Sequence, residues 1–190
     1  TFNLVPSLLD QLDLYAAGGL DRHLELTLRP ADQLHEGEKL EILDTFFCAH
    51  PNNMIEPYPR FQELFRKHAA SLSKRAVLPA LFTSEEIRDL QLWSNLVWID
   101  PIFHDEEPIR RLMRKERHFT EEDKRGLIDW QLELMKRVVP TYRDLYRQKK
   151  IDISFTPYYH PILPILCDTE SAREALPGIG LPKQRFATRL

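Results

Sequence analysis

The segment IDISFTPYYHP, residues 151–161, holds the pattern that decides the fold. Ile151, Ile153 and Phe155 alternate with polar residues, and this period of two is typical of a β-strand. A proline-bounded stretch follows directly. The segment therefore predicts a short strand near residues 151–156 that ends in a loop.

The loop predicted after this strand carries three candidate ligand-binding residues, Tyr158, Tyr159 and His160. Tyrosine rings offer flat apolar faces, and an imidazole can donate or accept a hydrogen bond. Loops on a rigid scaffold often carry function. In the alternative interpretation, His160 is half-buried and only fixes the turn between Pro157 and Pro161. The residues alone leave both interpretations open.

A second strand is predicted at the start of the chain, near residues 1–5, where Phe2 and Leu4 flank Asn3. The stretch PSLLDQLDLYAAGG, residues 6–19, follows as a helix, because its leucines recur at helical spacing and its glycine pair is a typical stop. A strand followed at once by a helix is the order of a β–α unit.

Residues 35–148, between the two strands, are predicted to be a mostly helical insertion. Capping boxes are predicted at Thr83 with Glu86 and at Thr120 with Asp123. The predicted helices run over residues 36–50, 58–68, 83–99 and 108–118, and from 120 onward with a break or kink at Pro140. Two strands alone do not make a stable sheet, so either further strands are missing or the helices carry the core. The expected fold class is α/β and helix-rich.

A dense aromatic and polar patch is predicted at a helix end, at Trp93, Asn95, Trp98 and Asp100. Tryptophan packs on flat apolar faces, while amides and carboxylates bind polar groups of a ligand. Tryptophans at helical spacing are also frequent in protein cores. The patch is therefore a candidate site in which one tryptophan contacts a ligand and the other packs in the core.

The composition is that of one ordinary domain of 190 residues, 43% of them hydrophobic. The 26 basic and 29 acidic residues nearly balance, so charge does not favour a nucleic acid or an anionic membrane as partner. No apolar run approaches the roughly 20 residues of a membrane span. The seven histidines lack the spacing of a zinc site, and we expect neither a metal nor a cofactor.

The two cysteines, Cys48 and Cys167, form no paired motif, which excludes a disulfide scaffold. Unpaired thiols fit either a reducing compartment or simply two buried cysteines, and we expect a cytoplasmic location. Thr1 is not a start residue, and the chain opens with an alternating pattern, so we expect the sequence to be a piece of a longer protein. The composition leaves the oligomeric state open.

Five segments together are typical of one enzyme family. They are TFNLVPSLLDQL, DRHLELTLRPADQL, DLQLWSNLVWIDP, FTEEDKRGLIDWQLELMKRVVPTYRDL and ISFTPYYHPILPILCDTESAREALP. Within them, TPYYHPILPIL and WSNLVWIDP are the most specific. The chain resembles family 57 of the glycoside hydrolases, which contains α-amylase-like and glucanotransferase-like enzymes. The resemblance covers nearly the whole chain and is weakest over residues 67–81.

This resemblance implies the N-terminal part of a catalytic domain, a distorted (β/α)7 barrel whose active site lies at the C-terminal ends of its parallel strands. Family members are retaining enzymes with a glutamate nucleophile and an aspartate acid/base about 5 to 5.5 Å apart. Both are expected beyond Leu190, so no catalytic residue is assigned here, and the isolated segment is expected to be inactive. The implied partner is an α-glucan or maltooligosaccharide.

The resemblance also gives the candidate residues a common role as the sugar-binding wall. His160 would bind a sugar hydroxyl, with Tyr158 and Tyr159 against a pyranose ring. The family motif Gly-Gln-Ile-Glu appears here as Lys149-Lys150-Ile151-Asp152, in which the carboxylate is about 1 Å shorter in reach.

Two further polar residues lie on the predicted strands, and each has two interpretations. Asp152 alternates with apolar neighbours, so it would face opposite to them and bind sugar hydroxyls, or it is an exposed strand residue beside two lysines. Asn3 has the same ambiguity on the opening strand. The rival interpretation of the whole chain is a stand-alone helical interaction module without catalysis, in which the patch of Trp93 and Trp98 receives a partner.

Overall fold

The computed structural model describes residues 1–162, 164 and 167–182. The chain divides into two compact units. The first, here called the sheet unit, comprises Thr1–Ala17 and Lys136–Leu190; the second, the helical unit, comprises Gly18–Met135. Part of the family-typical segment TPYYHPILPIL, at residues 163 and 165–166, lies outside the described residues.

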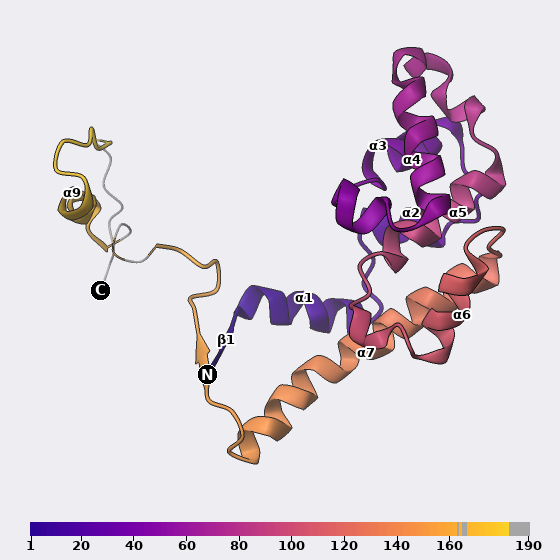
Figure 1. Ribbon diagram of the computed structural model, residues 1–190. Helices are drawn as coiled ribbons and strands as arrows, with labels where there is room; N and C mark the ends of the chain where they lie inside the picture. The colour runs from indigo at the N-terminus through magenta and orange to yellow at the C-terminus, as the bar shows by residue number, and fades with distance from the viewer. Residues whose placement is uncertain (163, 165–166, 183–190) are drawn as a thin grey trace. The chain divides into compact units, whose positions relative to one another are not determined.

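The sheet unit is built around two parallel strands from opposite ends of the sequence. β1 (Phe2–Leu4) pairs with β2 (Ile153–Phe155), with Phe2 opposite Ile153 and Leu4 opposite Phe155. Figure 1 shows the two strands side by side, with α1 (Pro6–Ala16) leaving the end of β1. The strands lie within the two segments that alternate in the sequence, and the helix begins at its proline as predicted.

The rest of the sheet unit consists of short or helical segments. The second part of α7 (Glu121–Arg147) leads to β2, and the division between the units falls inside this helix. η4 (Thr169–Ser171) and α9 (Ala172–Ala175) follow, and the Asp168 carboxylate accepts a hydrogen bond from the Glu170 amide at 3.0 Å. Asp168 therefore caps a helix, as its position in the sequence indicates.

The helical unit contains the remaining elements, which follow one another through short joints. They are α2 (Arg22–Leu28), α3 (Glu36–Thr45), the π-helix η1 (Pro51–Ile55), α4 (Pro59–Ser71), the 3-10 segment η2 (Leu72–Leu81), α5 (Ser84–Leu96), η3 (Pro101–Phe103), α6 (Glu107–Lys115) and the first part of α7.

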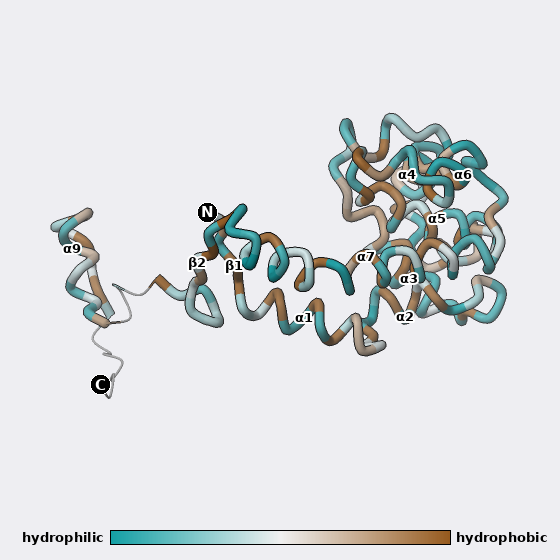
Figure 2. Tube along the Cα trace, turned by 90° about the horizontal axis from the view of Figure 1, so that it is seen from below, coloured by the Kyte–Doolittle hydropathy of each residue, from teal (hydrophilic) through white to brown (hydrophobic). Residues whose placement is uncertain are grey.

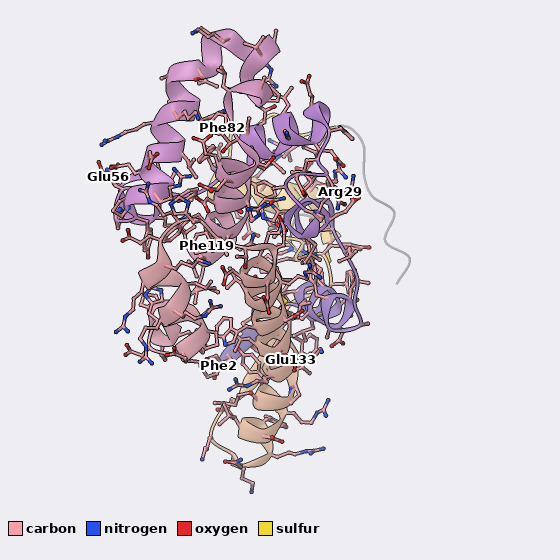
Figure 3. All side chains as sticks on the ribbon, turned by 90° about the vertical axis from the view of Figure 1, so that its right-hand side faces the viewer. Phe2, Arg29, Glu56, Phe82, Phe119 and Glu133 are labelled. Carbon is pink, nitrogen blue, oxygen red and sulfur yellow. The ribbon has the colours of Figure 1, made fainter. Side chains whose placement is uncertain are left out.

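The core of the helical unit is a cluster of apolar side chains around α5. Phe61 and Leu90 are fully buried, and Trp93 is 1% exposed. Figure 2 shows hydrophobic residues gathered inside this unit, and Figure 3 labels two of its core rings, Phe82 and Phe119. Burying a large apolar side chain contributes about 1.5–3 kcal/mol, so this cluster is the main source of stability of the helical unit.

A buried lysine joins three segments of the same unit. The Lys124 ammonium group, 1% exposed, donates to the carbonyl of Arg29 and to the side chain of Gln91, both at 2.8 Å, and forms an ion pair with Glu121 at 2.7 Å. Burial lowers the pKa of Lys124, and the ion pair with Glu121 opposes that shift. These contacts satisfy a cation that would otherwise be costly to bury. Arg29 is labelled in Figure 3.

The turn between α6 and α7 contains residues with unusual backbone angles. Glu116 has φ 60° and ψ −40°, and the Arg117 amide donates to the Lys115 carbonyl at 2.6 Å, which makes a tight γ-turn. The buried indole of Trp93 donates to the Glu116 carbonyl at 2.8 Å, and the buried Asp89 accepts from the Phe119 amide at 3.1 Å. The core thus holds this turn in place.

Both predicted capping boxes are confirmed. Thr83 and Glu86 exchange side-chain to backbone hydrogen bonds at the start of α5, at 2.8 and 3.1 Å. Thr120 and Asp123 do the same at the start of α7, at 3.0 and 3.1 Å. Such pairs satisfy amides that the helix itself leaves without partners.

Three details of the helical predictions are wrong. The helix expected over residues 36–50 ends at Thr45, and a π-helix occupies the joint from Pro51 to Ile55. α2 was not predicted, although Asp21 caps it by accepting from the Leu24 amide at 2.7 Å. The break expected at Pro140 is not seen, because α7 continues through this exposed proline, which removes a single backbone hydrogen bond; a kink there stays a prediction.

Within the described residues, none of the helices combines the length and apolarity that crossing a membrane requires. In the same part of the chain, no group of three or more His, Cys, Asp or Glu side chains is arranged to hold a metal ion.

Candidate binding site

A hollow of about 460 Å³ lies in the sheet unit, between α1 and the loop that follows β2. All three residues predicted in that loop line it, together with one face of α1; the set is Ser7, Asp10, Gln11, Leu14, Tyr158, Tyr159 and His160. Its volume lies within the usual range for small-molecule sites, roughly 300–1,000 Å³.

The parallel pairing of the strands explains why these residues meet. In a parallel pair the carboxyl ends of both strands lie at the same edge, so the segments after Leu4 and after Phe155 emerge together. The Thr156 amide donates to the Leu4 carbonyl at 3.3 Å, so a hydrogen bond joins the carboxyl ends of the two strands. α1 then begins at Pro6 and places its first turns beside the loop.

A hydrogen bond within the lining of the hollow joins Tyr158 to α1. The Tyr158 hydroxyl donates to the Asp10 carboxylate at 2.6 Å. This hydrogen bond raises the pKa of Tyr158, because it favours the protonated phenol, and burial and the negative charge of Asp10 act in the same direction. Tyr159 packs edge-on against Tyr158, with ring centroids 4.7 Å apart. Its own ring remains 86% exposed.

His160 lies in a turn with a left-handed backbone. Its φ is 50°, and its amide donates to the Pro157 carbonyl at 2.8 Å. The imidazole Nδ1 lies 3.1 Å from the Thr156 hydroxyl, while the residue as a whole is exposed and lines the hollow. A left-handed conformation is uncommon for residues other than glycine, and such residues cluster at functional sites.

The residues contributed by α1 were missed by the sequence analysis. Ser7, Asp10, Gln11 and Leu14 recur at intervals of three and four, so they share one helix face. Figure 2 shows apolar and polar residues alternating along α1. The available signal was the polar face of a helix that follows a strand directly, because such a face lies next to the loops at the carboxyl edge.

The lining of the hollow is suited to a neutral, hydroxyl-rich ligand. The exposed ring of Tyr159 offers a flat apolar face, and the serine, aspartate, glutamine and histidine can donate or accept hydrogen bonds. Sugars present both an apolar C–H face and a rim of hydroxyls. No catalytic carboxylate pair is defined by this lining, since Asp10 is its one carboxylate and is bonded to Tyr158.

Two predicted residues on the strands do not line this hollow. Asp152 is exposed and precedes β2, so it lies at the strand end opposite to His160; its carbonyl accepts from the Phe2 amide at 2.7 Å. Asn3 is exposed, and its side-chain oxygen accepts from the Ser154 hydroxyl at 3.2 Å. Sugar contact by either residue stays a prediction.

The four residues of the predicted aromatic patch belong to the helical unit. Trp93 is a core residue packed against Tyr58 and Phe119, with ring centroids 4.9 and 6.1 Å away, and this corrects its assignment as a ligand contact. A ring that is 1% exposed has no face for a sugar. Trp98, in contrast, is 62% exposed.

The polar members of the patch have internal partners. The Asn95 amide donates to the Gln91 carbonyl at 2.9 Å and to the Thr27 hydroxyl at 3.3 Å. The Asp100 carboxylate accepts from the Ile102 amide at 3.0 Å and caps η3. Trp98 is therefore the exposed aromatic residue of the patch.

Comparison with known proteins gives one family. The sequence model of the family described as glycosyl hydrolase family 57 matches residues 28–179, which is most of the sequence. No curated protein and no solved structure matches the chain. Because this match covers well over half of the sequence, the chain belongs to glycoside hydrolase family 57.

Proposed function

We propose that this chain forms part of a retaining glycoside hydrolase or transferase that acts on α-glucans, and that it supplies a wall of the sugar site. The observation that carries the proposal is the hollow at the carboxyl edge of β1 and β2, lined by Tyr158, Tyr159 and His160. Family membership supports the general activity, glycoside hydrolysis or transfer. The proposed substrate is an α-glucan or a maltooligosaccharide.

The proposal includes a distorted (β/α)7 barrel completed by further strands. Parallel strands are normally covered on both faces, yet Phe155 is 79% exposed and Phe2 is 48% exposed. A two-stranded parallel pair is also marginal by itself. In a completed barrel, side chains of the other strands would cover one face of this pair and helices the other, which supports a larger sheet.

In this scheme, the chain binds and orients the sugar, and a glutamate nucleophile and an aspartate acid/base come from strands beyond Leu190. Retaining enzymes hold these carboxylates about 5 to 5.5 Å apart on the two sides of the scissile bond. The residues of the hollow would fix a neighbouring sugar ring, so that the bond is presented to both groups.

The proposal keeps Asp152, Asn3 and Trp98 as predicted sugar contacts that do not line the hollow. The change from glutamate to aspartate at position 152 would alter specificity, because a shorter carboxylate selects a different hydroxyl. We also propose a cytoplasmic location, which is supported by the two exposed free thiols, Cys48 and Cys167. Family membership argues against the rival interpretation, a helical interaction module without catalysis.

Calorimetric titration of maltooligosaccharides into the full-length protein tests this proposal. Tyr159→Ala should weaken binding about threefold to tenfold, because a stacked ring contributes roughly 0.5–1.5 kcal/mol. His160→Ala should weaken binding as well, through the loss of a hydrogen bond to a hydroxyl.

Tyr146→Ala is the matched control, since Tyr146 is also an exposed tyrosine of the sheet unit, 57% exposed, but does not line the hollow. The Tyr146→Ala variant should bind maltooligosaccharides with the same affinity as the wild type. If Tyr159→Ala and His160→Ala both bind and turn over maltooligosaccharides like the control, the hollow is not the sugar site.

A further inference from the structure

A second, smaller hollow lies in the helical unit, between η1 and α4. Its volume is about 120 Å³, which corresponds to about four water molecules and is below the range for drug-sized ligands. Ile55, 1% exposed, and the half-buried ring of Phe65 give it an apolar floor. The hollow therefore has room for one edge of a small ring that lies against its apolar surface and is otherwise exposed.

Four polar side chains surround this floor, namely Asn52, Glu56, Gln62 and Arg66. Within residues 1–162, 164 and 167–182, none of these four side chains has a hydrogen-bond or ion-pair partner. Most charged side chains of the helical unit are paired, as Arg60 is with Asp89 at 2.8 Å. Figure 3 shows Glu56 at the outer edge of the unit, accessible to a ligand.

The backbone beside the hollow has an unusual geometry. The Glu56 amide donates to the Pro51 carbonyl at 2.8 Å, which is the i to i+5 bond of a π-helix. π-helical turns are rare and are found frequently at functional sites. This turn carries Asn52 and Glu56, while α4 carries the other two polar residues.

The chemistry of the lining selects the class of ligand. One carboxylate and one guanidinium balance each other, which disfavours a charged ligand such as a phosphate. Two side-chain amides each present a donor and an acceptor, as sugar hydroxyls do. The floor of Ile55 and Phe65 suits the C–H face of a pyranose.

We propose that this hollow is a second sugar-binding site, which holds a single hexose unit of a glucan on the helical unit. The inference goes beyond the proposed function, because this site needs no catalytic residue and shares no residue with the hollow at Tyr158. Its role would be to retain a long glucan on the enzyme by a second point of attachment, which raises the effective concentration of the chain.

Nuclear magnetic resonance with maltotriose tests the proposal on the full chain carrying Tyr159→Ala, which weakens the first site. The side-chain amide signals of Asn52 and Gln62 should shift on titration. Adding Glu56→Gln and Arg66→Gln should weaken this binding about tenfold or more, because hydrogen bonds to charged groups are among the strongest.

Glu122→Gln with Arg125→Gln is the matched control. Glu122 and Arg125 line another open surface hollow, whose lining contains neither a side-chain amide nor an aromatic ring. Their replacement removes one negative and one positive charge, as the replacement of Glu56 and Arg66 does. This control should bind like its parent. Unshifted amide signals at Asn52 and Gln62, or an equal loss of affinity in the control, would overturn the second site. Neither result depends on sugar binding in the first hollow. Failure of the proposed function would be seen separately, as unchanged maltooligosaccharide binding in Tyr159→Ala.

Discussion

At the scale of single residues, Tyr158 and Glu116 show how a local environment determines a role. Tyr158 is fixed by Asp10, so one ring of the candidate site is positioned before any ligand binds. Glu116 adopts positive φ because Trp93 and Asp89 hold the turn around it. Neither partner is a sequence neighbour, and for this reason the sequence could not predict these contacts.

The first residue-scale prediction concerns the ionisation of Tyr158. Its hydrogen bond to Asp10 exists only with the protonated phenol, so its stabilising effect is present below the ordinary tyrosine pKa of about 10 and is lost as pH rises through the raised value. Asp10→Ala should lower the pKa of Tyr158 toward its ordinary value, because the hydrogen bond to Asp10 is the largest cause of the shift. The difference in phenolate absorbance between each protein and its Tyr158→Phe variant measures this pKa.

Asp13→Ala provides the control, because Asp13 is an exposed aspartate of α1 that does not line the hollow. It should leave the titration of Tyr158 unchanged. A Tyr158 pKa that is the same in wild type and Asp10→Ala would contradict the contact.

The second residue-scale prediction concerns Glu116. Positive φ costs a non-glycine residue about 1–3 kcal/mol, whereas glycine adds roughly 0.5–1 kcal/mol of chain entropy to the cost of folding. Glu116→Gly should therefore raise the free energy of unfolding by about 1 kcal/mol, as measured by urea denaturation. Glu116→Ala should bring no such gain, since alanine keeps the Cβ atom; equal gains in the two variants would show that the backbone is not the cause.

At the scale of elements, the starts of helices were predictable from the sequence, whereas an element that depends on tertiary packing was not. The capping boxes of α5 and α7 use residues three apart, so the sequence contains the whole signal. The π-helix from Pro51 to Ile55 replaces a predicted loop because its apolar residue, Ile55, is buried in the core. Burial of this kind depends on partners distant in sequence.

The element-scale prediction concerns the start of α7. Burial alone would raise the pKa of Asp123, but hydrogen bonds from Lys115, Thr120 and Arg111 outweigh it, so the pKa is lowered well below its ordinary value. A lowered carboxylate pKa stabilises the fold above the unfolded-state value, near 4, and this stabilisation is lost as pH falls below it. Asp123→Asn should therefore lose less stability than the wild type between about pH 6 and pH 3.

Urea midpoints measured across that range check the prediction. Asp129→Asn is the control, because Asp129 is an exposed aspartate of the same helix, and its curve should follow that of the wild type. Parallel acid curves for wild type and Asp123→Asn would mean that Asp123 does not contribute to acid sensitivity.

At the scale of the whole molecule, the stability of the chain is concentrated in the helical unit. Its core contains large residues from each of its main helices, whereas α1 in the sheet unit has no fully buried side chain. The sequence predicted a helical block between two strands, and this arrangement is observed. The boundary between the two units, at residues 135 and 136, falls inside a continuous helix. The sequence therefore has no turn or change of composition there from which the boundary could be predicted.

The candidate site was predictable to a similar degree. The three loop residues, Tyr158, Tyr159 and His160, were identified because the alternating strand ends directly before them. The α1 residues were not, since only the parallel pairing brings that helix to the loop. The sequence left open which tryptophan of the patch, Trp93 or Trp98, packs in the core, because helical spacing does not distinguish a buried indole from an exposed one.

The whole-molecule prediction concerns the helical core. Leu90→Ala should lower the free energy of unfolding by about 2–5 kcal/mol, because the fully buried side chain leaves a cavity. Leu72→Ala is the control; Leu72 is 51% exposed, and a surface change usually costs within about 0.5 kcal/mol. Urea denaturation followed by tryptophan fluorescence, to which the buried Trp93 contributes, measures both. Similar losses in the two variants would contradict the assigned core.

The pairing of β1 with β2 also affects the order in which the protein forms during synthesis. Asn3 must wait for Ser154, 151 positions later, before its strand has a neighbour. The helical unit lies between them in the sequence and emerges from the ribosome before β2, so it is able to fold while β1 is still unpaired. Until translation passes Phe155, the apolar edge of β1 is available to wrong partners, and the nascent chain would depend on chaperones most during that interval.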